Sequence, residues 1–150
     1  SPFDAWLMIR GLRTLELRLQ RSSATAAILV SALKGHPAIT RIYYPFLPSH
    51  PGYTLATRQM KACSGLFSMD LNVSSPRQVE VFCDALQYFL KAVSWGGFES
   101  LTFPALTFYD FDQPEKNAIS WKTVRLYAGL EDADLLVDDL LNALNLLIHE

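Results

Sequence analysis

The sequence predicts an α/β fold in which a small sheet is covered by helices on one face, a two-layer sandwich. Segments with helical spacing of apolar residues alternate with short segments that have period-two alternation or many β-forming residues. A chain of 150 residues suits a single domain, and its 50% hydrophobic residues supply a core. Because the expected strands are few and short, two layers are the natural solution.

The N-terminal third predicts one long helix from Ser1 to about Leu33. Ser1 can cap the helix, and Pro2 fits its first turn. Gly35 stands at the usual stop position, with a proline two residues beyond. Gly11 lowers helix propensity by about 1 kcal/mol relative to alanine, so we expect a bend or close packing there.

The rest of the chain predicts strands and helices in alternation. Ser75 and Pro76 repeat the cap-and-proline signal and open a helix that runs to about Phe89. Residues 102–120 have no clear period and hold two prolines, which indicates a long surface loop. The other expected elements are strands at 38–44, 66–71, 91–94 and 123–128, a short helix at 53–61, and a last helix that begins near Asp132.

Composition excludes several classes of function. A net charge of −2 with scattered basic residues does not favour binding to nucleic acid or to an anionic membrane. No segment approaches the ~20 apolar residues that span a bilayer. Cys63 and Cys83 have no neighbouring histidine or paired cysteine, so a metal site is not expected. They are expected to be reduced, partly buried thiols of a cytoplasmic protein.

Arg125 is the first candidate for a binding residue. It lies inside an expected strand, where alternation places Val124, Leu126 and Ala128 on the opposite face. A guanidinium at such a position needs an anionic partner, because its desolvation is costly. That partner can be an acid of the same fold, or it can be a ligand carboxylate, which arginine binds bidentately.

The segment Ser94-Trp95-Gly96-Gly97-Phe98-Glu99-Ser100 is the second candidate. Its two glycines allow a tight turn and a close approach of the backbone to a ligand, and free N–H groups there can cradle an anion. A plain turn between strands explains the same pattern. The histidines, His36, His50 and His149, lie beside turns or the terminus and are expected to be structural or solvated rather than catalytic.

Five strings occur in order over almost the whole chain. They are Arg10-Gly11-Leu12-Arg13-Thr14-Leu15, His36-Pro37 with Tyr44-Pro45 and Pro48, Ser64-Gly65-Leu66-Phe67-Ser68, Ser94 to Leu101, and Val124 to Asp132. Together they resemble the RGL[KR]TL, HP…YPxLP, glycine-led strand, SxGGxESL and VRLSxGLED segments of the Cys/Met metabolism enzymes, which use pyridoxal phosphate.

The resemblance implies the small C-terminal domain of a fold-type-I enzyme, with a small, mostly antiparallel sheet and helices on one face. In that family Arg125 would bind the substrate α-carboxylate, Ser94 would contribute to the same pocket, and Trp95 would line the entrance. The implied partners are an amino-acid substrate, an N-terminal domain that holds pyridoxal 5'-phosphate, and further copies in a homotetramer. The resemblance implies no catalytic residue and no cofactor-binding residue in residues 1–150.

Trp95 is typical of the bacterial cystathionine β-lyases, whose loop reads SWGGYESL, so we expect α,β-elimination from cystathionine, a step in methionine biosynthesis. The absence of a threonine–histidine string after Pro104-Ala105 points the same way. Val93 and Tyr127 depart from the family pattern. The alternatives are cystathionine γ-synthase, cystathionine γ-lyase, methionine γ-lyase, or a non-catalytic module that binds an amino acid or a protein.

None of the five lysines lies in a setting like the family's Schiff-base motif. We therefore expect that residues 1–150 form one C-terminal domain, that the cofactor-binding domain is absent from this chain, and that the chain alone is inactive. The lysines in question are Lys34, Lys61, Lys91, Lys116 and Lys122.

Overall fold

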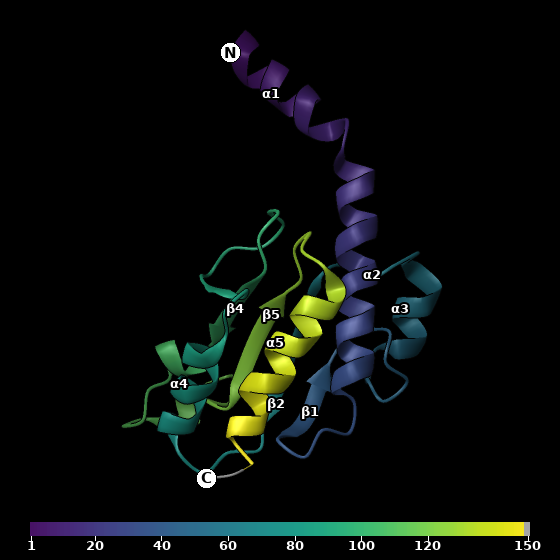
Figure 1. Cartoon of the computed structure of the whole chain (residues 1–150). Coiled ribbons are helices and arrows are strands. Elements are labelled where there is room, and N and C mark those ends of the chain that lie inside the picture. Colours follow the sequence, from purple (N-terminus) through teal and green to yellow (C-terminus); the bar gives the residue numbers. More distant parts are fainter. Residues whose placement is uncertain (149–150) are drawn as a thin grey trace.

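The computed structural model describes residues 1–148. It contains one sheet and five α-helices, in a two-layer arrangement that confirms the predicted fold class (Figure 1). The strands are β1 (Ile39–Tyr43), β2 (Leu66–Leu71), β3 (Leu90–Lys91), β4 (Leu101–Pro104) and β5 (Thr123–Tyr127). The helices are α1 (Pro2–Leu12), α2 (Leu15–Leu33), α3 (Tyr53–Gln59), α4 (Pro76–Ala85) and α5 (Ala133–Leu146), with 3₁₀ turns η1 (Ala105–Phe108) and η2 (Pro114–Lys116).

The strand order is β1-β2-β5-β4-β3, and only the pairing of β3 with β4 is parallel. Helices α2, α4 and α5 cover one face of the sheet, while α1 extends away from it (Figure 1). The core lies between these helices and β2 and β5, where Phe82, Leu126 and Leu140 are fully buried. The last helix follows its leucine spacing, and the Asp132 side chain caps its start.

The single helix predicted over 1–33 is two helices. The break falls at Arg13 and Thr14, just after Gly11, so the expected bend is present but takes the form of an interruption. Arg18 braces it by donating to the Gly11 carbonyl at 2.9 Å. No residue of α1 is buried, and the Cβ position of Gly11 meets open space, so close packing does not explain this glycine.

Two predictions for the middle of the chain were wrong. The strand expected at 91–94 is only Leu90–Lys91, and the loop expected over 102–120 begins with strand β4. Strand β4 lies between β5 and β3, and its residue Thr102 and the preceding Ser100 are fully buried. The sequence pattern did not predict this strand because it is four residues long, carries the polar residue Thr102 at a buried position, and ends at Pro104.

Candidate functional site

Strand β5 presents Arg125 on the face of the sheet that the helices leave open. Val124 and Leu126 are fully buried on the helix side, which confirms the predicted alternation. Arg125 pairs with Ser68 of β2 on one side and with Phe103 of β4 on the other. The register therefore places Arg125 between the hydroxyl-bearing residue Ser68 and the aromatic residue Phe103.

The Arg125 side chain reaches across β4 to the predicted Ser94–Ser100 turn. Its Nη2 donates to the carbonyl of Val93 and, at 3.4 Å, to that of Ser94. Its guanidinium carbon lies 5.4 Å from the ring centre of Trp95 and 5.3 Å from that of Phe103. The structure thus brings together the three residues predicted for substrate binding, Arg125, Ser94 and Trp95.

No acid within residues 1–148 forms an ion pair with Arg125. On the same face Asp70 is held by other groups: it accepts from the Tyr43 hydroxyl at 2.6 Å and from the Thr123 hydroxyl at 2.5 Å. The hydrogen bond to Asp70 is the main cause that raises the pKa of Tyr43. The Arg125 guanidinium is therefore held by backbone carbonyls and aromatic rings, and it has N–H groups that can donate to an external carboxylate.

The turn that faces Arg125 is fastened at its C-terminal half. Ser100 donates to the Glu131 carboxylate through its amide and its hydroxyl, both at 2.8 Å, and its hydroxyl accepts from the Gly129 amide at 2.9 Å. The Tyr127 hydroxyl donates to the Gly97 carbonyl at 3.2 Å. These contacts hold the turn against the end of β5, so Ser94 and Trp95 stand at a defined position beside Arg125.

Glu131 is a positioning residue that the sequence analysis did not single out, and its partner Ser100 was named there only as the last residue of the candidate turn. Both belong to strings it quoted, but they lie thirty-one residues apart and nothing in the local pattern joins them. A glutamate three residues after the end of a strand reads as an ordinary helix-start acid. Only the register of β4 against β5 brings its carboxylate to the turn.

A cavity of about 340 Å³ lies beside Arg125 on the open face. Phe103, Phe108 and Ile119 form its apolar lining, and Ser68, Thr123 and Arg125 its polar side. An apolar cavity with a few convergent polar groups is the usual form of a small-molecule site. It adjoins the guanidinium, so it can accept the part of a ligand that extends from a bound carboxylate.

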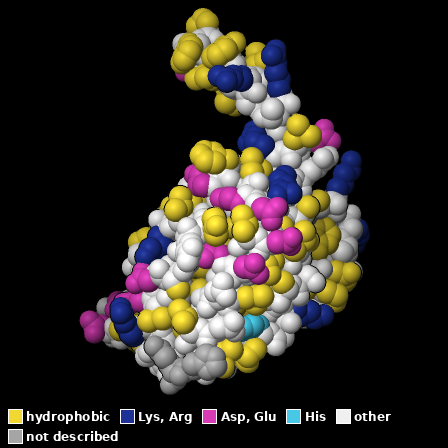
Figure 2. Space-filling view, in the orientation of Figure 1, with side chains coloured by type: hydrophobic (Ala, Val, Ile, Leu, Met, Phe, Trp, Pro, Cys, Tyr) yellow, Lys and Arg dark blue, Asp and Glu magenta, His cyan; other side chains and the backbone are white. Residues whose placement is uncertain are grey.

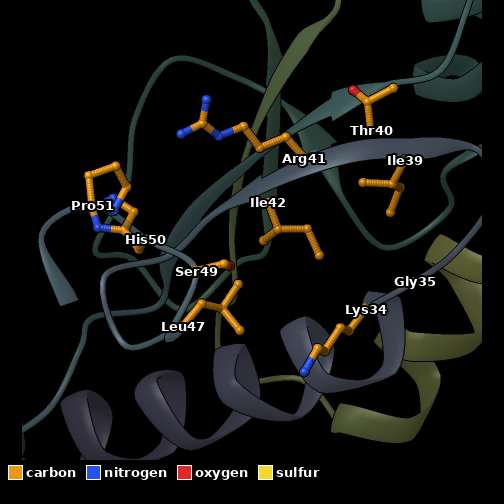
Figure 3. Close-up of a pocket in the computed structure, with 10 residues that line it drawn as sticks. All are labelled: Lys34, Gly35, Ile39, Thr40, Arg41, Ile42, Leu47, Ser49, His50 and Pro51. Carbon is orange, nitrogen blue, oxygen red and sulfur yellow. The ribbon is translucent and has the colours of Figure 1, made fainter.

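A second cavity, of about 310 Å³, lies between the end of α2 and the loop after β1 (Figure 3). Lys34 and Arg41 line it but extend in different directions, and the Arg41 guanidinium lies over the ring of Tyr43 at 4.7 Å. His50 accepts the Gly52 amide at 3.0 Å, a turn contact. The cationic groups do not converge, so this cavity is not an evident anion site.

The remaining candidates have structural roles or lie elsewhere. His36 accepts the Ala38 amide at 3.2 Å, a turn contact like that of His50, and His149 lies outside the described residues. Cys63 and Cys83 are buried and free, and burial raises the pKa of the Cys83 thiol to about 11. Within residues 1–148 no cluster of metal-ligating side chains is present, and no helix there has the length and apolarity to cross a membrane.

Similar proteins were found both by sequence and by structure. The L-methionine gamma-lyase of Pseudomonas deceptionensis is 44% identical over 92% of this chain and 36% of its own length. The cystathionine gamma-synthase of Mycobacterium leprae is 38% identical over 97% of the chain and 37% of its length. The crystal structure of cystathionine gamma synthase from Xanthomonas oryzae pv. oryzae in complex with cystathionine superposes with a TM-score of 0.86 at 37% identity, over 97% of this chain and 38% of that one.

The chain therefore spans a little over a third of the length of these relatives. Their names are those of γ-acting enzymes, which favours the alternative raised in the sequence analysis over the cystathionine β-lyase prediction. Trp95 and the turn around it are thus insufficient to identify the subfamily.

The lysines of the chain do not fit a covalent pyridoxal-phosphate site. All except the half-buried Lys122 are exposed, and none lines the cavity beside Arg125. Lys91 is paired with Asp84, and the Lys122 ammonium lies over the Trp121 ring at 5.2 Å. Among the described residues, Arg125 lines this cavity and no lysine does.

The family assignment rests on the whole length of the fold. A model of the Cys/Met metabolism PLP-dependent enzyme family matches residues 1–145, which includes every element from α1 to the last turns of α5. The five strings lie inside that match, and the superposition shows the same architecture. The chain belongs to the Cys/Met metabolism family of pyridoxal-phosphate-dependent enzymes.

Proposed function

We propose that this domain supplies the carboxylate-binding side of the active site in a pyridoxal-phosphate-dependent enzyme that acts on sulfur-containing amino acids. Arg125 binds the substrate α-carboxylate, Ser94 contributes to the same pocket, and Trp95 lines its entrance. Holding the carboxylate fixes the orientation of the amino acid, and with it the bond that is presented for reaction.

The observation that carries the proposal is the state of Arg125. Its guanidinium has no carboxylate partner within residues 1–148, yet its direction is set by two backbone carbonyls and two aromatic rings. Such a group is already oriented and has no internal ion pair to break before it binds a ligand carboxylate. A structural arginine would instead form an ion pair with an acid of its own fold. The adjoining apolar cavity suits the side chain of the same ligand.

We propose that the reaction is elimination or replacement at the γ-carbon, because the relatives named above are a γ-synthase and a γ-lyase. Cystathionine β-lyase is the second candidate, and the observation that favours it is the tryptophan of the SWGG turn. The two differ in their product: γ-elimination yields 2-oxobutyrate, and β-elimination yields pyruvate.

The cofactor and its lysine, in this proposal, come from a cofactor-binding domain that works together with residues 1–150. Pyridoxal phosphate supplies the electron sink for the reaction when it is bound. The lysines described above do not offer a site for it, so this domain acts by binding and orienting the substrate. Alone it should show no turnover.

The test is kinetic and uses the enzyme in which this domain is joined to its cofactor-binding domain. Arg125→Ala removes the charge-assisted hydrogen bonds to the carboxylate, which are worth about 1.5–3 kcal/mol. We therefore expect kcat/KM for the amino acid to fall roughly 10–100-fold, mostly through KM, while the cofactor absorbance is unchanged. Product analysis of the unaltered enzyme decides between 2-oxobutyrate and pyruvate.

Arg125→Lys is the matched variant, because it keeps the charge and loses the planar fork. A partial recovery of KM is expected, since lysine binds a carboxylate as a point charge. An unchanged KM in Arg125→Ala would reject the assigned role of this residue. Loss of cofactor absorbance would show instead that Arg125 supports the cofactor site.

A further inference from the structure

Arg125 has no internal ion pair, although an acid lies close to it on the open face of the sheet. Within residues 1–148, Asp70 is the only acid that belongs to a strand. The pairing of β2 with β5 sets Asp70 opposite Thr123, which is two residues from Arg125 on the same face. Such diagonal neighbours are roughly 7–8 Å apart, a separation that long side chains can bridge. An ion pair between Asp70 and Arg125 is therefore within reach, yet it is not formed.

Acids elsewhere in the domain have other neighbours. Figure 2 shows acidic side chains gathered over the start of α5, where Asp132 caps the helix, on the helix-covered side of the molecule. Arg125 lies on the other face of the sheet. In the turn that faces Arg125, the Glu99 carboxylate lies against Gly97, close enough to overlap a Cβ there. Asp70 is thus the acid that shares a strand pair and a face with Arg125.

Two hydroxyls hold the Asp70 carboxylate in place. Thr123 donates to its Oδ1 at 2.5 Å from the β5 side, and Tyr43 donates to its Oδ2 at 2.6 Å from the β1 side. Bonds of this length between a hydroxyl and a carboxylate are among the stronger hydrogen bonds in proteins. The oxygen on the β5 side, which is the strand of Arg125, is therefore already engaged by Thr123.

Arg41 is the cation on the opposite side of Asp70. The register of β1 with β2 sets it across from Asp70, and its guanidinium lies over the Tyr43 ring at 4.7 Å. No ion pair joins Arg41 to Asp70 in the described part of the chain. The Tyr43 side of the carboxylate thus has a cation of its own nearby. Of the two hydroxyls, that of Thr123 is the one on the Arg125 side.

We propose that Thr123 is a positioning residue, which keeps Arg125 available to the substrate by engaging the Asp70 oxygen on the β5 side. The role rests on the proposed function, because availability matters only if Arg125 binds the substrate carboxylate. Without the Thr123 hydroxyl, this oxygen loses its donor from β5, and Arg125 is the donor two residues along the same face. An ion pair between Arg125 and Asp70 would have to open before a ligand could bind, which lowers the apparent affinity.

The test uses the complete enzyme, in which this domain is joined to its cofactor-binding domain. Thr123→Val keeps the β-branched shape and the strand preference of the residue and removes the hydroxyl. Ion pairs that solvent can reach are weak, so we expect KM for the amino acid to rise roughly two- to fivefold, with kcat and the cofactor absorbance unchanged. Thr123→Ser, which retains the hydroxyl, should recover most of this loss.

The decisive measurement is rescue by removal of the competing charge. Asp70→Asn in the Thr123→Val background leaves no carboxylate to capture Arg125, so KM should return close to that of the unaltered enzyme. A direct contact between Thr123 and the ligand, or a loosened β5, would not be repaired in this way. Thr40→Val is the matched control: its hydroxyl donates to the Asp70 backbone carbonyl at 3.2 Å rather than to the carboxylate, so KM should not change.

The outcomes separate the role of Thr123 from that of Arg125. An unchanged KM in Arg125→Ala rejects the proposed function itself. A raised KM in Arg125→Ala with an unchanged KM in Thr123→Val rejects only the role of Thr123, and so does a raised KM that Asp70→Asn does not lower. Tyr43→Phe, on the Arg41 side, should raise KM less than Thr123→Val, and an equal rise would also overturn the role. If Thr123→Val does not fold, Thr123→Ala with and without Asp70→Asn gives the same comparison.

Discussion

The two faces of the sheet have different roles: one forms the hydrophobic core, and the other carries polar groups that solvent or a ligand can reach. The face under α2, α4 and α5 is lined by Val124, Leu126 and Met69, all fully buried. The open face carries Arg125, the Asp70 hydrogen-bond network and an apolar cavity that opens to solvent. Stability is therefore concentrated on one side of the sheet, and the groups that can meet a ligand stand on the other.

This separation explains how a small domain can hold a charged arginine in a fixed direction. The strand that carries Arg125 is immobilised by its helix-facing neighbours, so the guanidinium does not need a salt bridge to keep its place. The direction of the guanidinium is also set by its contacts with Val93, Ser94 and Trp95. The turn at 94–100 is in turn held by the hydrogen bonds between Ser100 and Glu131. Changes on the two faces should accordingly have different consequences.

The largest loss of stability is expected for a substitution that creates a cavity under the helices, on the covered face of the sheet. Phe82→Ala should lower the free energy of unfolding by about 3–5 kcal/mol, because a fully buried ring is lost and its surroundings relax only partly. Phe108→Ala, on the open face, should cost less than about 1 kcal/mol since that ring is mostly exposed. Denaturant unfolding of both variants measures the difference, and equal losses would contradict the separation of roles.

Alkaline pH should weaken the covered face through Cys83. Burial raises the pKa of this thiol from 9.0 to about 11. Between these two values the unfolded chain has lost the proton that the folded chain still binds, so stability falls as pH rises, by roughly 2–3 kcal/mol in all. Below pH 9 the contribution is constant.

Unfolding measurements between pH 8 and 11, compared with Cys83→Ala, isolate this effect. The variant starts less stable, because a buried side chain is shortened, but its pH dependence should be flatter over that range. Tyr44, whose pKa is raised to about 12 mainly by burial, continues the decline at higher pH in both proteins. Parallel curves for the two proteins would show that Cys83 does not titrate in this range.

Gly129 lies where the end of β5 meets the turn at 94–100, and we expect a side chain there to lower the stability of the fold. A Cβ at this position would overlap the Phe98 carbonyl and the Glu131 carboxylate, which hold the turn at 94–100. Gly129→Ala should therefore cost about 1–3 kcal/mol and displace the turn. The matched control is Gly11→Ala in α1, where a Cβ meets open space and the helix should gain up to ~1 kcal/mol. Similar melting temperatures for the two variants would show that the packing around Gly129 can accommodate a Cβ.

The smallest change in stability is expected for Arg125→Gln on the open face. The side chain gives up hydrogen bonds to two carbonyls that solvent can satisfy, so the free energy of unfolding should change by less than about 1 kcal/mol. The same variant should lose affinity for the amino acid in the complete enzyme. A loss of stability above ~2 kcal/mol would mean that Arg125 is mainly a structural residue.

Local patterns predicted much of this molecule. The alternation of residues 123–128 predicted the direction of Arg125, because side chains in a strand point to opposite faces in turn. The cap-and-proline signal at Ser75-Pro76 predicted the start of α4, and the leucine spacing predicted α5. The quoted strings identified the family, which residues 1–145 confirm. They did not identify the subfamily, since one tryptophan in a turn is a smaller signal than similarity over the whole domain.

Tertiary structure decided the features that depend on distant parts of the chain. Strand β4 exists because β5 and β3 flank it, although its own four residues lack a strand pattern. The sequence by itself determined which face Arg125 occupies, because backbone geometry couples neighbouring residues directly. Only the folded chain placed Val93, Ser94 and Trp95 at the guanidinium and Glu131 at Ser100, because contacts across thirty residues depend on strand register, which no local pattern records.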